Sequence, residues 1–202
     1  MFTVLALNVQ GQSLTDTPVV MKERSEIAHF FVDKPFLYTI TESNKDYIVD
    51  IYNDELQKSR KFTVKNAVFN REDNMAYGIV DLDMDNLTGY DAYSGSLLSQ
   101  YLFNDDDKIE YVFCTFKKQT TGERYEYILQ KAEVINEDGE ILGTLPVEAV
   151  EFYAGYDMLE ISVELTQIGD NYYIVNDEEL NEPVDPGEPT YNTSYWKLNK
   201  SK

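Results

Sequence analysis

The stretch FLYTIT-ESNK-DYIVDIY, residues 36–52, decides the fold class. Residues 36–41 and 46–52 are rich in β-branched and aromatic side chains, which favour extended strands. Residues 42–45, between them, are polar and include Ser43 and Asn44, which are typical of turns. The pattern predicts an antiparallel hairpin.

The same pattern recurs along the chain. Residues 109–117 are apolar at successive positions, which predicts a central strand covered on both faces. No run of twelve or more residues has the apolar spacing of a helix. We therefore expect an all-β fold of repeated antiparallel hairpins, either partial β-propeller-like or a β-sandwich. Further strands are expected at residues 61–65, 76–84, 122–135, 140–145, 147–152, 158–165 and 172–176.

Three of these hairpins share an ending. Each is followed by an asparagine and two acidic residues: Asn53-Asp54-Glu55, Asn136-Glu137-Asp138 and Asn176-Asp177-Glu178. We interpret all three as acidic turns at irregular spacing. Internal duplication and independent convergence on Tyr/Ile/Val hairpins both explain the likeness.

The chain is strongly acidic. Its 202 residues include 37 Asp and Glu against 17 Lys and Arg, which gives a net charge of −20. Such a surface has little with which to neutralise phosphates, so nucleic acid is excluded as a partner and anionic membranes are disfavoured. The 43% of hydrophobic residues suffices for a folded core.

Residues 1–11 differ from the rest of the chain. Residues 2–9 are nearly apolar and too short to cross a bilayer, so no transmembrane segment is expected here. With Val9 and Gly11 at the −3 and −1 positions, they resemble the end of a secretory signal cleaved before Gln12. The alternative is a first strand with Phe2 and Val4 on one face. A signal remnant predicts export to the periplasm, the cell surface or the medium.

The positions of the prolines predict the remaining domain boundaries. Residues 12–182 are expected to form the all-β domain, and residues 183–202 a proline-rich linker and C-terminal tail. The NEPVDPGEP segment, residues 181–189, holds three of the six prolines. The residues after it are either a terminal strand or the stub of a following domain.

One segment carries a family resemblance. Residues 98–111, LSQYLFNDDDKIEY, are followed after a strand pair by INEDG at residues 135–139. This pattern resembles β-repeat segments of exported proteins of Bacteroidetes-type bacteria, many of which carry a type IX secretion sorting domain. The resemblance covers residues 46–145, and it implies an exported bacterial protein of β-repeats without implying a particular activity.

Two acidic clusters are candidate cation sites. Asp81, Asp83 and Asp85 would share one face of a strand, and Ca²⁺ prefers such oxygen ligands. The cluster departs from a calcium-binding loop at Asn86, where glycine is required, and at Ala92, where glutamate is required. A solvated acidic turn is the alternative for this cluster. Residues 104–107, NDDD, are better interpreted as a turn that enters a core strand. Beyond Ca²⁺ no cofactor is indicated.

Catalytic signatures are missing from the sequence. Cys114 lies among apolar residues and is interpreted as a core residue, and His29 is the single histidine. No nucleophile elbow, phosphate-binding loop or metalloprotease motif occurs. We therefore predict no catalytic residues and no enzyme.

Aromatic residues in expected loops are the candidate ligand-binding residues. Flat rings stack on the apolar face of a sugar, while nearby acids and amides bind its hydroxyls. Tyrosines that pair across strands are the alternative explanation. The candidates are Tyr90, Tyr93, Tyr153, Tyr156, Tyr191, Tyr195 and Trp196.

The sequence thus predicts an exported, non-enzymatic β-repeat protein that serves as a structural or interaction module. Its partner would be a protein or a glycan at the cell surface. A carbohydrate-binding module that uses exposed Tyr and Trp is the first alternative, and a glycoside hydrolase-like enzyme is the second.

Overall fold

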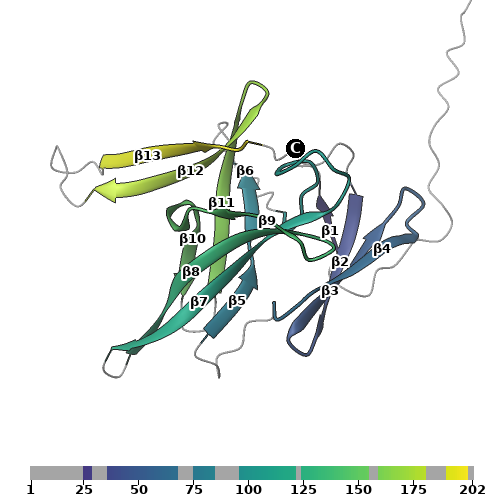
Figure 1. Cartoon of the computed structure of the whole chain (residues 1–202), viewed down its shortest axis with the longest axis horizontal. Helices are drawn as coiled ribbons and strands as arrows, with labels where there is room; N and C mark the ends of the chain where they lie inside the picture. The colour runs from purple at the N-terminus through teal and green to yellow at the C-terminus, as the bar shows by residue number, and fades with distance from the viewer. Residues whose placement is uncertain are drawn as a thin grey trace, which may run out of the picture.

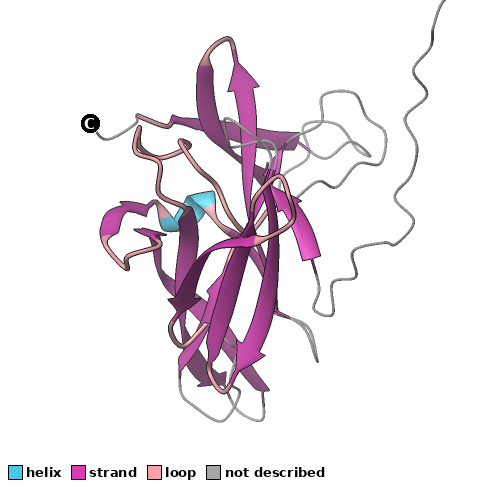
Figure 2. Cartoon of the chain, turned by 90° about the vertical axis from the view of Figure 1, so that its right-hand side faces the viewer, coloured by secondary structure: helices cyan, strands magenta, loops and turns pink. Residues whose placement is uncertain are grey.

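The computed structural model describes residues 25–28, 36–67, 75–84, 96–121, 124–154, 159–180 and 190–199. Within these residues the chain forms thirteen β-strands, one short 3-10 turn and no α-helix (Figure 2). The strands lie in three sheets that do not close into a barrel (Figure 1). The predicted all-β class with repeated antiparallel hairpins is confirmed.

The N-terminal sheet contains the hairpin with which the sequence analysis began. Its strands follow one another antiparallel in chain order. The turn between the second and third strands is Asn44-Lys45, and Asn44 has a positive φ of 60°. The strands are β1 (Ser25–Ala28), β2 (Phe36–Ser43), β3 (Asp46–Tyr52) and β4 (Lys58–Val64).

The central sheet has the order β5-β7-β8-β9 and is antiparallel throughout. Its two long strands, β7 and β8, form the hairpin that extends farthest from the molecule in the lower part of Figure 1. The strands are β5 (Met75–Ile79), β7 (Glu110–Thr121), β8 (Arg124–Asn136) and β9 (Ile141–Leu145).

The C-terminal sheet repeats this meander in the order β10-β11-β12-β13, and β6 adds to it by pairing parallel with β11. Residues 76–84 were predicted as one strand but form two, because the chain leaves the central sheet at Val80 and Leu82 then pairs with Val163. The strands are β6 (Asp81–Met84), β10 (Glu151–Ala154), β11 (Leu159–Ile168), β12 (Asn171–Leu180) and β13 (Thr190–Lys197).

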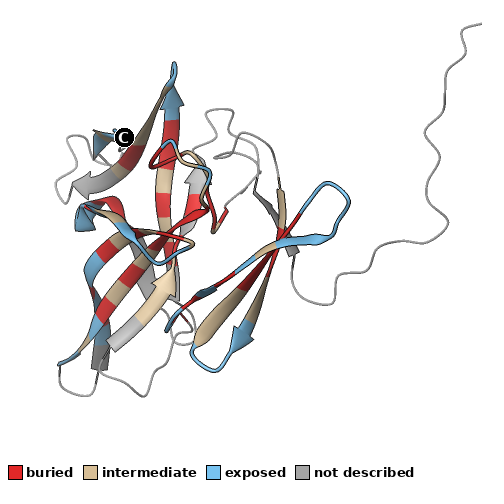
Figure 3. Cartoon of the chain, turned by 45° about the vertical axis from the view of Figure 1, so that its right-hand side comes forward, coloured by how far each residue is buried: buried red, intermediate tan, exposed pale blue. Residues whose placement is uncertain are grey.

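The central sheet is buried on both faces, as residues 109–117 predicted. Val112, Cys114 and Phe116 of β7 pack in one core with Val163 and Leu165 of the C-terminal sheet. The alternate residues of β7 face the other way. Tyr111 belongs to a second core with Tyr38, Val49 and Phe62 of the N-terminal sheet, and Phe113 packs against it. Residues 110–116 of β7 are accordingly all buried or partly buried, and buried bands run through the central sheet (Figure 3).

Both predicted architectures have a counterpart here. The central and C-terminal sheets enclose one core between them, as the sheets of a sandwich do. The N-terminal and C-terminal sheets are each built on four antiparallel strands that follow one another in the chain, as a propeller blade is, whereas the central sheet skips β6. The structure thus combines blade-like sheets with sandwich-like packing.

One predicted strand is wrong in part. Residues 147–152 begin with the 3-10 turn Val147–Ala149, and only Glu151–Ala154 is a strand. Pro146, which has no N–H to give to a ladder, stands at the start of the turn, and its carbonyl accepts from the Ala149 N–H at 3.1 Å. Proline thus ends β9 and starts a tight turn.

Two of the three acidic turns have the same structure. The Asn53 side-chain oxygen accepts the N–H groups of the residues two and four positions later, and Asn136 does the same. In both turns the residue three positions after the asparagine has a positive φ, Leu56 in one and Gly139 in the other. The third prediction was wrong, because Asn176 lies inside β12 and pairs with Ser194.

The C-terminal tail contributes a strand. Of the two alternatives for the residues after Pro189, the structure has the strand: Thr190–Lys197 pairs with β12 along its whole length. Residues 1–11 lie outside the described part of the chain, as does the proline-rich segment 181–189.

Gly78 of the central sheet packs closely against Ile161 of the C-terminal sheet. A Cβ atom at Gly78 would lie 2.9 Å from Ile161 Cδ1, whereas one at Gly143 would meet nothing within 4 Å. We expect Gly78→Val to lower the free energy of unfolding by about 1–3 kcal/mol, since overpacked cores lose stability. Urea unfolding measures this loss.

Gly143→Val is the matched control and should be neutral or stabilising, because valine favours strands. Adding Ile161→Val to Gly78→Val removes the clashing methyl group, so the double variant should lose less stability than the two single losses added together. Full additivity would contradict a direct contact between the two positions.

Candidate functional site

The densest polar network of the described residues surrounds a buried carboxylate. Glu110 begins β7 and is 0% exposed. One of its oxygens, Oε2, accepts from Ser99 Oγ and from the Phe103 N–H, each at 3.1 Å, and the other accepts from the Asn104 N–H at 3.0 Å. Burial raises the pKa of Glu110, and these three donors act in the opposite direction. The carboxylate thus ties residues 99–104 to the start of β7.

The tied segment completes both cores. We call residues 96–109 the clasp segment. Leu98 and Ile109 of this segment pack in the core beneath the N-terminal sheet, while Leu102 and Phe103 pack in the core shared with the C-terminal sheet. Backbone bonds in both directions between Ser99 and Glu110 fix its register. The clasp segment therefore packs among the three sheets and contributes side chains to both cores.

The acidic cluster at residues 104–107 forms a turn before a core strand, as predicted. Asn104 donates from its amide to Asp106 Oδ2 at 3.0 Å, and its side-chain oxygen accepts from the Asp106 N–H. Asp106 Oδ1 in turn accepts from the Lys108 N–H at 2.8 Å. The oxygens of Asn104 and Asp106 that take part in these bonds shape the turn.

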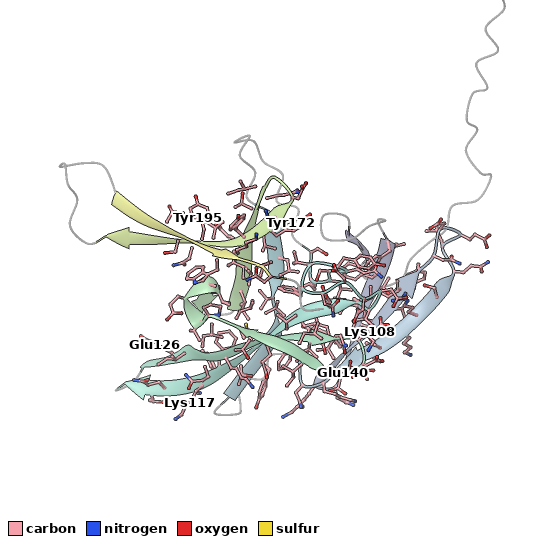
Figure 4. The ribbon with its side chains drawn as sticks, turned by 45° about the horizontal axis from the view of Figure 1, so that its top comes forward. Lys108, Lys117, Glu126, Glu140, Tyr172 and Tyr195 are labelled. Carbon is pink, nitrogen blue, oxygen red and sulfur yellow. The ribbon has the colours of Figure 1, made fainter. Side chains whose placement is uncertain are left out.

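This turn contacts the acidic turn at residues 136–140. Lys108 Nζ lies 2.9 Å from Asp138 and 3.0 Å from Glu140, and the two carboxylates raise its pKa. The Asn136 amide and Lys108 lower the pKa of Glu140. Lys108 and Glu140 lie side by side in Figure 4. Arg60 of β4 joins them by donating to the Asp107 carbonyl at 2.8 Å, which links the N-terminal sheet to the same corner.

The predicted metal site lies largely outside the described part of the structure. Asp81 and Asp83 are in β6, where the ladder places Asp83 beside Glu164, but their side chains are not described and neither is Asp85. Among the side chains that are described, no group of three or more His, Cys, Asp or Glu is arranged to hold a metal ion.

Two of the predicted aromatic candidates have described side chains, and the structure does not bring them together. Tyr195 of β13 is 57% exposed. Trp196, the next residue, is partly buried against the core. Tyr153 and Tyr191 lie in strands, with side chains outside the description, and Tyr90, Tyr93 and Tyr156 lie outside it altogether.

Cys114 is a core residue, as predicted. It is fully buried, and burial raises the pKa of its thiol to about 12. A thiol needs to be deprotonated to act as a nucleophile, so this one is unreactive at neutral pH in the folded protein. His29 lies outside the described residues.

The sequence did not point to a hollow at one end of the C-terminal sheet. It has a volume of about 270 Å³ and is lined by Leu102, Asp170, Asn171, Tyr172, Lys197, Leu198 and Asn199. These residues come from the clasp segment, the β11–β12 turn and the end of β13, three places far apart in the chain. The local sequence signal near the hollow is Gly169, a turn glycine with a φ of 61°.

Comparison with protein-family models, curated proteins and solved structures finds no match for the chain. The resemblance to exported β-repeat segments therefore stays a prediction. No helix among the described residues is long and apolar enough to cross a membrane.

Replacing Glu110 tests the clasp. Glu110→Gln puts an NH₂ group opposite N–H donors, so we expect it to lower the free energy of unfolding at pH 7 by about 1–3 kcal/mol. The Glu110 pKa is raised in the folded state, so the wild type gains stability as the pH falls through that raised pKa towards the unfolded value. Glu110→Gln has no carboxyl group to protonate and lacks this gain. The free energy of unfolding of the wild type should therefore exceed that of the variant by a larger amount at pH 5 than at pH 7.

Urea unfolding of both proteins across this pH range makes the measurement. The exposed carboxylates are the same in both proteins and cancel in the difference. A difference in the free energy of unfolding that becomes smaller as the pH falls would contradict the proposed balance of burial and hydrogen bonding at Glu110.

Proposed function

We propose that the chain is an exported, non-enzymatic β-repeat module that binds another protein through a sheet edge. The observation that carries the proposal is the outer edge of β9. This strand reads ILGTL, carries no charged residue, and is the last strand of the central sheet. Ile141 at its start is 59% exposed.

Uncharged edge strands are uncommon in soluble proteins because they invite another strand to pair with them. The contrast within this molecule supports the proposal, since the edge strand β4 reads KSRKFTV and carries Lys58, Arg60 and Lys61. A partner strand added to β9 would gain backbone hydrogen bonds and would cover Ile141. The opposite edge strand of the same sheet, β5, is uncharged too and reads MAYGI, but its Tyr77 and Ile79 are partly buried, whereas Ile141 of β9 is 59% exposed. In a chain of net charge −20, this exposed apolar position on an uncharged edge favours binding at β9.

Three of the described reactive groups serve the fold, which supports a non-enzymatic role. The Cys114 thiol lies in the core, and the Glu110 carboxylate receives three protein donors. Lys108 is held between Asp138 and Glu140. Export is supported by the apolar residues 2–9, with small residues at the positions that a signal peptidase requires.

Photo-crosslinking tests the edge. A benzoylphenylalanine at position 141 of the full chain is exposed to the extracellular fraction of the source cells. We expect one discrete adduct, and Thr144→Lys should reduce its yield by about tenfold, because a lysine on an edge strand opposes pairing. The matched control is Thr63→Lys on the charged edge β4, which should leave the yield unchanged. An adduct that is unaffected by Thr144→Lys would refute the proposal, and so would the lack of a discrete adduct.

A carbohydrate-binding module is the second candidate, and the exposure of Tyr195 favours it. Tyr195 is 57% exposed, and an exposed ring can stack on a sugar. On a glycan array we expect Tyr195→Ala to abolish binding and Tyr195→Phe to retain it, with Ca²⁺ present or absent. Equal binding by wild type and Tyr195→Ala would remove Tyr195 as the platform.

A further inference from the structure

The hollow at the end of the C-terminal sheet has a floor and a rim of different character. Leu198, which is partly buried, provides apolar surface, whereas Leu102 is 1% exposed and lies behind the lining. Tyr172, also partly buried, adds one aromatic ring (Figure 4). Asp170 and Asn199 are exposed at the rim. An apolar floor with a few polar groups around it is the usual composition of a small-ligand site.

The hollow is held by the fold on each side. Gly169 and Asp170 form the tight turn that closes the pair Ile168 and Asn171. The Leu198 N–H donates to the Tyr172 carbonyl at 2.9 Å, which extends the β12–β13 pairing to the end of the lining. Leu102 belongs to the clasp segment that Glu110 holds in place. The site therefore exists without a ligand to shape it.

The polar groups of the lining select a class of ligand. One carboxylate, Asp170, and one ammonium group, Lys197, balance in charge. The amides of Asn171 and Asn199 each provide donors and an acceptor. Such a mixture suits a ligand that carries many hydroxyl groups and no net charge. An acidic ligand would be repelled by a chain of net charge −20.

We propose that this hollow binds a single neutral sugar ring. Its volume of about 270 Å³ lies just below the range of sites for drug-sized ligands, so it suits one ring rather than an extended chain. The Tyr172 ring and Leu198 would contact the apolar face of the sugar, while the two asparagines and Asp170 would bind its hydroxyls. The site lies apart from β9 and does not depend on a partner strand there.

Titration of the full chain with neutral methyl glycosides, followed by amide NMR shifts, tests the proposal. We expect saturable shifts at Asn171, Tyr172 and Leu198, with a dissociation constant on the order of millimolar, as is usual for a small polar ligand in an open site. Asn171→Ala and Asn199→Ala should each weaken binding by about tenfold. Tyr172→Phe retains the ring and the packing, so it should still bind.

Thr193→Ala is the matched control, because Thr193 is exposed on the same strand β13 but does not line the hollow. Unchanged binding by this variant supports the hollow as the site. Binding lost in Tyr195→Ala and retained in Asn171→Ala would overturn the proposal in favour of the exposed ring. Equal shifts with glycerol, equal affinity for glucuronate, or no saturable shift with any glycoside would each also overturn it.

Discussion

A carboxylate that is removed from water and held by three protein donors organises this molecule. Placing Glu110 in the interior is unfavourable unless its oxygens are bonded, and the donors come from Ser99, Phe103 and Asn104. The three bonds force residues 99–104 to fold back over the start of β7. Leu98, Leu102 and Phe103 are thereby carried into the two cores. The hydrogen bonds of Glu110 thus determine where these apolar side chains pack.

The central sheet depends on this arrangement because its two faces belong to different cores. Val112 and Cys114 face the C-terminal sheet, while Tyr111 faces the N-terminal sheet. A sheet of this kind needs cover on both sides, and the clasp segment fills the junction where the three sheets meet. Arg60 adds an electrostatic link across the same junction through the Asp107 carbonyl and Glu137. The layers are joined at one corner of the central sheet.

Local pattern was enough to predict most strands and not enough to predict how they combine. The hairpin at residues 36–52 and the two-sided burial of residues 109–117 could be predicted because alternation and apolar runs are local signals. Residues 147–152 were misassigned because apolar side chains outweighed the effect of Pro146 on the backbone. Asn176 resembled the other turn asparagines in sequence, but pairing with β13, a tertiary effect, keeps it in a strand.

The candidate sites were harder to predict for the same reason. Glu110 occurs at the edge of an apolar run, and no local rule indicates that its carboxylate is buried, since its donors are six to eleven residues away and two of them are backbone N–H groups. The hollow brings Leu102 together with Tyr172 and Lys197, which only the sheet order makes neighbours. Tyr195 was expected in a loop, but it lies in β13, where it is 57% exposed because of its place in the sheet.

Leu56 and Gly139 occupy the same place in two turns of the same form, although glycine tolerates a positive φ far better than leucine does. The first turn therefore keeps its backbone shape through the Asn53 side chain, against the preference of the residue at its tightest point. If the two meanders share an origin, the evidence for it is the backbone geometry of their turns and one shared asparagine, rather than the identity of the residue at the positive φ. Residue types reveal the shared asparagine and acids of the two turns, and the hydrogen bonds and the positive φ three residues later show that the backbones correspond as well.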